Sequence, residues 1–96
     1  MSFEVKIGRF GNDDAANITV DGRLVGWLER VYGERFKSVT SYARVSYVSH
    51  YTIVLTDDAA AEQLRKEDVD SRKEAKLEVE HAFERAWIAL TTKESA

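Results

Sequence analysis

Apolar and polar residues alternate along the first part of the chain. Residues 3–7 place Phe, Val and Ile at every second position, which is the period of a strand with one buried face. Residues 18–20 and 24–28 are two further apolar runs, joined by Asp21 and Gly22. An Asp-Gly pair suits the positive φ angles of a two-residue type I′ turn. The pattern therefore predicts an amino-terminal strand followed by a β-hairpin.

The turn also predicts the pairing within this hairpin. Counting outward from Asp21 and Gly22 pairs Val20 with Arg23 and Ile18 with Val25, and it would bring Ala16 opposite Trp27. Residues directly opposite each other share one face of a sheet. We expect the core face to hold Ile18, Val20, Val25, Trp27 and Val31.

Residues 36–55 are rich in Val, Tyr, Thr and Ile, and the odd positions from 43 to 55 are mostly apolar. Both features are typical of strands. Two interpretations are open: one long bent strand, or two strands that turn near Ser49 and His50. Ser-His is a poor turn dipeptide, yet we favour two strands.

The last third of the chain has a helical pattern. Asp57 and Asp58 precede three alanines and can cap a helix. Ser71 and Glu74 fit a capping box, which indicates a break near residues 68–71 and leaves one helix or two as alternatives. Farther on, apolar residues recur at intervals of three and four, as in an amphipathic helix: Ala75, Val79, Ala82, Phe83, Ala86, Trp87 and Leu90.

Together these elements predict an α+β fold. We expect residues 1–96 to form a single domain, with an antiparallel sheet of about four strands in residues 1–56 and a helical part in residues 57–91. One long carboxyl-terminal helix should pack on one face of the sheet, and residues 92–96 should form a frayed tail. The length of 96 residues, with 44% hydrophobic and 32% charged residues, suits one compact domain.

Composition excludes several kinds of chemistry. The chain has no cysteine, so disulfides, thiolate metal sites and cysteine nucleophiles are excluded. Its amino end has no apolar signal region, and its longest strongly apolar run is residues 53–55, so we expect a cytoplasmic protein with no membrane contact. No matched set of catalytic residues is evident, and we expect neither an enzyme nor a cofactor.

The sequence also has two weak patterns of metal-binding or catalytic residues. Glu78 and His81 have the E-x-x-H spacing of carboxylate-bridged metal sites, but such sites need carboxylates from facing helices. Ser49 and His50 could be placed beside an aspartate as a triad, but the sequence does not fix that geometry. We interpret both histidines as non-catalytic.

Charge is distributed unevenly along the chain, which has a formal net charge of -3. Residues 1–56 carry seven Lys or Arg and six Asp or Glu, whereas residues 57–96 carry seven and eleven. In an unbroken helix, four carboxylates would align along one ridge. The ridge would consist of Glu67, Asp70, Glu74 and Glu78. It is either a solvated face or a surface that binds a protein partner with a basic surface.

Basic and aromatic residues mix in the sheet region, as in surfaces that stack single-stranded bases. This pattern supports an alternative in which the sheet binds nucleic acid through Arg30, Tyr32, Arg35, Lys37 and Arg44.

A few antiparallel strands with an Asp-Gly hairpin, followed by one amphipathic helix in an acidic chain without Cys or Pro, resemble the layout of small phage or mobile-element proteins, including anti-CRISPR-type inhibitors. The resemblance implies a stand-alone protein that occupies a surface of a larger host machine. We therefore expect a non-catalytic binding protein, an inhibitor or adaptor, with a nucleic-acid-binding module as the alternative. The sequence leaves open whether the protein forms a homo-oligomer.

Overall fold

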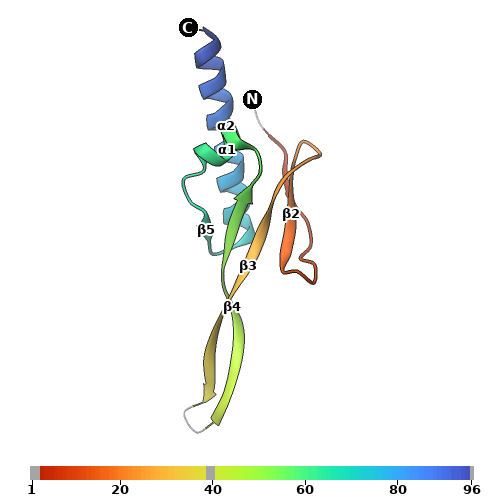
Figure 1. The fold of residues 1–96 in the computed structure, drawn as a ribbon, viewed down its shortest axis with the longest axis vertical. Coiled ribbons are helices and arrows are strands. Elements are labelled where there is room, and N and C mark those ends of the chain that lie inside the picture. Colours follow the sequence, from red (N-terminus) through yellow and green to blue (C-terminus); the bar gives the residue numbers. More distant parts are fainter. Residues whose placement is uncertain (1–2, 39–40, 96) are drawn as a thin grey trace.

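The computed structural model describes residues 3–38 and 41–95, and the side chains of residues 3–33 and 46–91. It has an α+β fold in which five antiparallel strands form an open sheet in the order β1-β2-β3-β4-β5, with a long helix packed against it (Figure 1). The predicted fold class is confirmed, with five strands where about four were expected. The elements are β1 (Val5–Ile7), β2 (Ala15–Val20), β3 (Arg23–Ser38), β4 (Ser41–Leu55), α1 (Asp58–Gln63), β5 (Asp68–Val69) and α2 (Arg72–Ser95).

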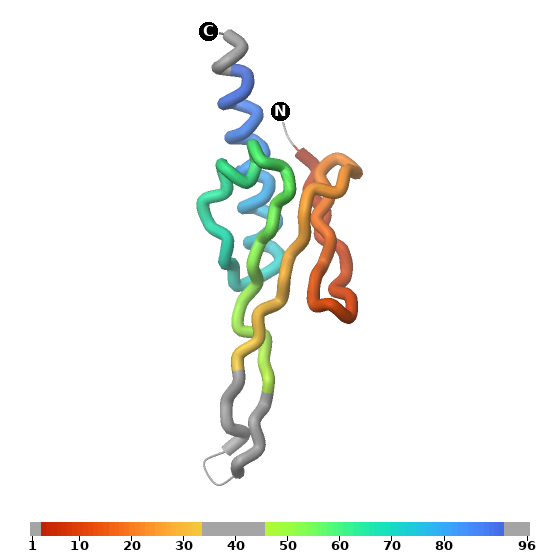
Figure 2. The backbone as a smooth tube through the Cα atoms, viewed as in Figure 1, coloured from red at the N-terminus to blue at the C-terminus, as the bar shows by residue number. Residues whose placement is uncertain are grey.

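The predicted turn between β2 and β3 is confirmed. Asp21 and Gly22 have φ angles of 51° and 82°, and Val20 pairs with Arg23. This turn and the loop that precedes β2 lie at opposite ends of that strand (Figure 2). Beyond the first pairs, the register shifts between Ile18 and Thr19. Ile18 therefore pairs with Gly26, and the predicted pairing with Val25 is wrong.

The bulge changes which residues of β3 face the core. Leu28 is fully buried in the core, whereas Trp27 is half-buried and its indole Nε1 donates a hydrogen bond to Glu29 Oε1 at 2.7 Å. Gly26, next to the bulge, lies very close to β4. A Cβ atom at this position would lie 2.0 Å from the Val54 carbonyl oxygen. The predictions that Trp27 and Val31 belong to the core are therefore wrong.

The core lies between the sheet and the first half of α2. Phe3 and Phe83 pack at its margin with ring centroids 5.9 Å apart. Burial of this apolar surface is the main force that holds α2 on the sheet. The buried cluster consists of Val5, Ile18, Val20, Val25, Leu28, Ile53, Val69, Ala75 and Val79.

β4 is one long strand, so the predicted turn near Ser49 and His50 is wrong. The register between β3 and β4 shifts at Val31 and Tyr32: His50 pairs with Val31 and Val48 with Tyr32, which leaves Ser49 as the additional residue of a bulge. Beyond this bulge the two strands pair with each other and project from the rest of the fold (Figure 1). We call residues 32–38 and 41–48 the arm, and the remainder the body.

The helical part contains two helices with a short strand between them. Asp57 caps α1 by accepting a hydrogen bond from the Ala60 N–H at 2.9 Å. β5 then pairs with β4, and α2 begins at Arg72, which places the predicted break within residues 64–71. α2 continues to Ser95, past the expected helix end at residue 91. Within the described ranges, no helix has both the length and the apolar content needed to cross a bilayer.

Candidate binding surfaces

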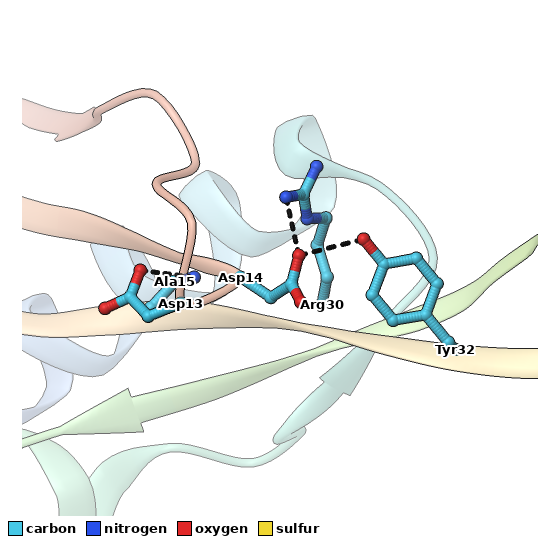
Figure 3. A network of polar contacts seen from close by, with 5 residues as sticks. All are labelled: Asp13, Asp14, Ala15, Arg30 and Tyr32. Atoms are coloured by element: carbon cyan, nitrogen blue, oxygen red, sulfur yellow. Dashed lines mark hydrogen bonds and ion pairs between the residues drawn. The ribbon is translucent and has the colours of Figure 1, made fainter.

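A polar network fixes the base of the arm on the body (Figure 3). Asp14 lies in the loop before β2 with a φ of 58°, and its Oδ1 atom accepts hydrogen bonds from Arg30 Nη2 at 2.6 Å and from the Tyr32 hydroxyl at 2.9 Å. The backbone supports the same contact, because the Arg30 N–H donates to the Asp14 carbonyl oxygen at 2.9 Å. Asp14 thereby joins the loop to two successive outward positions of β3.

The Arg30 guanidinium also lies over the Phe10 ring. Its Cζ atom lies 4.5 Å from the centroid of the Phe10 ring, and Phe10 stacks on Tyr51 with centroids 5.6 Å apart. Such cation–π contacts are favourable, and more so where they exclude water. The Arg30 side chain is 28% exposed, and its Nε atom is buried without a hydrogen-bond partner among the described residues. The Arg30 side chain is thus held by contacts within the network.

The network also affects the acidity of Tyr32. The hydrogen bond to the Asp14 carboxylate raises the pKa of Tyr32, because ionising the phenol would remove the donated proton and place two negative charges together. Tyr32 therefore acts as a hydrogen-bond donor over the neutral pH range.

The structure brings together two of the five residues predicted for nucleic-acid binding. Arg30 and Tyr32 meet at Asp14, where the carboxylate already offsets the charge of Arg30. The side chains of Arg35, Lys37 and Arg44 lie outside the described residues; their backbones belong to β3 and β4. Sequence reasoning missed Asp14, because residues 11–14 (Gly-Asn-Asp-Asp) have the composition of an ordinary turn.

The described part of the arm exposes apolar side chains to solvent. Tyr32 is 46% exposed, Tyr47 is 43% exposed and Val48 is 39% exposed. Tyr47 also covers Gly33, its partner across the strand pair. Amphipathic aromatic residues of this kind are enriched where proteins contact their partners.

The four carboxylates predicted to form one helical ridge are not on one helix. Glu67 and Asp70 lie in the segment around β5, and Glu74 and Glu78 lie on α2. The single ridge is wrong because α1 ends at Gln63. Glu74 instead stabilises the start of α2: it forms an ion pair with Lys66, and its Oε2 atom accepts a hydrogen bond from the Asp70 N–H at 3.0 Å.

The predicted capping box at the start of α2 is confirmed in part. Ser71 Oγ accepts a hydrogen bond from the Glu74 N–H at 3.1 Å. The returning bond from the Glu74 carboxylate goes to the N–H of Asp70, one residue before the usual partner.

A serine, a histidine and an aspartate do lie in a row on β4 and β5. Ser49 Oγ is 3.2 Å from His50 Nδ1, and His50 Nε2 is 3.7 Å from Asp68 Oδ1. In a catalytic triad the serine faces Nε2 and the carboxylate accepts from Nδ1, which is the opposite arrangement. The Asp68 carboxylate is also 69% exposed and already accepts a bond from Thr52 Oγ1 at 2.9 Å. We assign this row a structural role in joining β5 to β4.

Glu78 and His81 lie one turn apart on α2, as their spacing predicts. Across the described residues, no group of three or more carboxylate and imidazole side chains is gathered closely enough to hold a metal ion.

Comparisons of the chain with protein-family models, with curated proteins and with solved structures gave no match. The function proposed below therefore rests on the geometry of this chain alone.

Proposed function

We propose that the protein is a non-catalytic binding protein, an inhibitor or adaptor that acts on a larger protein or complex through its arm. The observation that carries this proposal is the extension of the β3–β4 pair beyond the body (Figure 1). An isolated two-stranded ribbon is marginally stable in water. The exposed apolar side chains of Tyr32, Tyr47 and Val48 would be stabilised by burial against a partner.

The network at Asp14 supports the same function. A projecting ribbon can place its side chains accurately only if its base is rigid, since ordering it on binding would cost conformational entropy. The contacts of Asp14 with Arg30 and Tyr32 hold the first residues of the arm in place before a partner arrives.

The test is partner capture with two charge-matched variants. Val48→Glu introduces a carboxylate on the arm, and Leu24→Glu introduces one on the body at a side chain that is 65% exposed. The parent and Leu24→Glu should retain the same protein from a lysate of the encoding organism, whereas Val48→Glu should lose it at an unchanged melting temperature. The complex is then reconstituted from the purified partner. Equal retention by both variants would exclude the arm as the contact.

The acidic residues are tested in the same assay. Glu67→Lys combined with Glu78→Lys reverses two exposed or half-exposed charges that make no ion pair among the described residues. If the arm is the contact, this variant retains the partner. Loss of the partner at an unchanged melting temperature would move the contact to the acidic residues and indicate a partner with a basic surface.

Nucleic-acid binding is a second candidate, favoured by the charge of the arm. The sequence of the arm has three cationic residues, Arg35, Lys37 and Arg44, and one carboxylate, Glu34. A two-stranded ribbon also fits the major groove of duplex DNA. Binding to duplex or single-stranded oligonucleotides should then weaken steeply with salt, and Arg35→Gln with Lys37→Gln should reduce the slope of that dependence. Affinity that does not change with salt would exclude this candidate.

A further inference from the structure

We propose that the carboxyl-terminal end of α2 is a second binding site, which accepts a basic amphipathic helix of a partner protein. The site consists of Trp87 and Leu90 together with the groove between α1 and α2 that adjoins them. The arm and this end of α2 lie at opposite ends of the molecule (Figure 1). The proposal therefore does not depend on the function proposed for the arm.

The apolar stripe of α2 continues beyond the part of the helix that covers the sheet. Val79 and Ala82 are fully buried. Trp87 lies four residues after the half-buried Phe83, and Leu90 lies eleven residues after Val79, so both stay on the same face of the helix. The exposed fraction nevertheless rises to 44% at Trp87 and 54% at Leu90, and Figure 1 shows that α2 extends past the strands. The face that belongs to the core early in α2 is therefore uncovered near its end.

An open groove between α1 and α2 adjoins this uncovered face. Its volume is about 230 Å³, and it is lined by Ala59, Glu62, Gln63, Ala86, Ala89 and Leu90. The three alanines allow another helix to approach closely, since the distance between packed helices depends on the side chains at their contact. Leu90 belongs to both the stripe and the groove, so the two form one continuous surface.

The charges around this surface are almost all negative. α1 and the part of α2 from Val79 to Thr91 together contain four carboxylates: Asp58, Glu62, Glu80 and Glu84. None of the four forms an ion pair with another described residue. The one Lys or Arg in these two segments, Arg85, donates from Nε and Nη2 to the Gln63 carbonyl oxygen at 3.1 Å and 2.7 Å. A segment with cationic side chains beside apolar ones is therefore complementary in charge.

Shape and charge together select the occupant. The walls of the groove are two helices, whose backbone groups are bonded within each helix, so they offer no strand edge to an extended peptide. An amphipathic helix can instead place apolar residues of one face on Trp87 and in the groove. Glu84 lies three residues before Trp87, and Glu80 lies four before Glu84, so these carboxylates are beside the indole on the helix surface. Lysine or arginine on the flank of the bound helix would meet them.

The same carboxylates disfavour a second copy of this chain. Pairing two α2 ends would bring Glu80 and Glu84 of one copy near their counterparts, and like charges across an interface are repulsive. Anionic lipid headgroups are repelled for the same reason.

The probe for this site is an acetylated and amidated peptide of leucine and lysine, about four helical turns long, with leucine at helical spacing on one face. Added to the isotope-labelled parent, it should give saturable shifts of the Trp87 indole signal and of the Ala86 and Ala89 amide signals. Two control peptides should give neither effect: one with glutamate in place of lysine, and one of the same composition with its leucines spread around the helix. Absence of shifts with the basic amphipathic peptide, or equal shifts with either control, would overturn the proposal.

Two variants with equal loss of exposed apolar surface locate the site. Trp87→Ala with Leu90→Ala should weaken binding of the basic peptide at least about tenfold. The control is Leu77→Ala with Ile88→Ala: these side chains are 47% and 61% exposed, and their spacing places them on the face of α2 opposite the core stripe. The control should keep the affinity within about twofold. Melting temperatures show whether each variant is folded, and equal weakening by both would overturn the proposal.

Charge reversal tests the selection of a basic partner. Glu80→Lys with Glu84→Lys should weaken binding of the basic peptide at least about tenfold and allow the glutamate peptide to bind. Glu67→Lys with Asp70→Lys makes the same charge change before the start of α2, with Asp70 about 25 Å from Trp87 by the rise of the helix. That variant should keep the affinity within about twofold, because charges beyond the screening length contribute little. Equal weakening by the two variants would mean attraction by net charge alone and would overturn the proposal.

The remaining occupants are tested with the same indole signal. Shifts of the Trp87 indole that appear with protein concentration alone would identify a second copy of the chain as the occupant. Larger shifts with vesicles of phosphatidylglycerol than with the basic peptide would identify a lipid surface. Either result would overturn the proposal.

Discussion

Gly33 and Tyr47 lie directly opposite each other in the arm, and the Tyr47 ring occupies the space that a side chain on residue 33 would need. A Cβ atom on Gly33 would lie 2.7 Å from Tyr47 Cζ and 2.8 Å from its hydroxyl oxygen. Covering a strand glycine with a cross-strand aromatic ring stabilises a ribbon that has few other contacts. The start of the arm thus depends on residue 33 having no side chain.

Three glycine-to-alanine variants should therefore lose different amounts of folding stability, in a fixed order. Gly26→Ala places a Cβ atom 2.0 Å from backbone of β4, which cannot yield, and should cost about 3 kcal/mol or more. Gly33→Ala displaces a side chain and should cost about 1 to 2 kcal/mol, with faster amide exchange confined to the arm. At Gly8 the nearest atom is 3.6 Å away, so Gly8→Ala should change stability by less than about 1 kcal/mol. Denaturant unfolding measures all three.

The extent of the core predicts a second contrast, between Leu28 and Trp87. Leu28 is fully buried, and Leu28→Ala should cost about 2 to 5 kcal/mol. Trp87 is 44% exposed, and Trp87→Ala should cost about 1 kcal/mol or less although it removes a larger side chain. Calorimetric melting of both variants checks the order. A larger loss for Trp87→Ala would place that indole in the core, as its helical spacing alone suggested.

These two residues show how far the sequence predicts the fold. The period of two, the Asp-Gly turn and the helical spacing are local signals, and they predicted β1, the β2–β3 turn and α2 correctly. The bulge near Ile18 shifts the pairing of β2 with β3, and counting residues outward from the turn assumes a ladder without a bulge, so the count could not find it. The helical stripe likewise gives no information on where the sheet beneath it ends, so Trp87 belongs to the stripe although its side chain is 44% exposed.

Acid should weaken the start of α2. The Lys66 ammonium and the Asp70 N–H lower the pKa of Glu74, so the folded state holds that carboxylate ionised to lower pH than the unfolded chain does. The resulting stabilisation is present above the unfolded pKa of Glu74, about 4.3, and is lost as the pH falls through the lower folded value. The stability difference between the parent and Glu74→Gln should therefore shrink between about pH 6 and pH 3, measured by denaturant unfolding.

Ser71→Ala is the control for that experiment. It removes the hydrogen bond to the Glu74 N–H, costing about 1 kcal/mol, but it removes no titrating group. The stability difference between the parent and Ser71→Ala should stay nearly constant with pH. A constant difference for Glu74→Gln as well would show that the ion pair with Lys66 does not contribute to stability in solution.

The candidate sites were less predictable than the fold. The ridge of Glu67, Asp70, Glu74 and Glu78 assumed one unbroken helix, but α1 ends at Gln63, and Asp68 and Val69 then pair with β4. The choice of Arg30 and Tyr32 was closer, since both are at the base of the arm, but their shared partner Asp14 is 16 residues before Arg30. Contacts between a loop and a distant strand leave no periodic signal in a sequence.

The Asp14 network makes the last prediction, on the ionisation of Tyr32. Ultraviolet absorbance during a pH titration, taken as the difference between the parent and Tyr32→Phe, should give a pKa for Tyr32 above the ordinary value of 10.0. Asp14→Asn should lower that pKa, because a neutral amide accepts the phenol proton without opposing the phenolate charge. Asparagine tolerates the positive φ of residue 14, so the variant tests the charge without disturbing the loop. Since the raised pKa favours the protonated folded state, the parent should also lose stability as the pH rises above about 10, and Asp14→Asn should lose less. A Tyr32 pKa that does not respond to Asp14→Asn would mean that the hydroxyl turns to solvent, and the contacts of Arg30 with Asp14 and Phe10 would then hold the base of the arm.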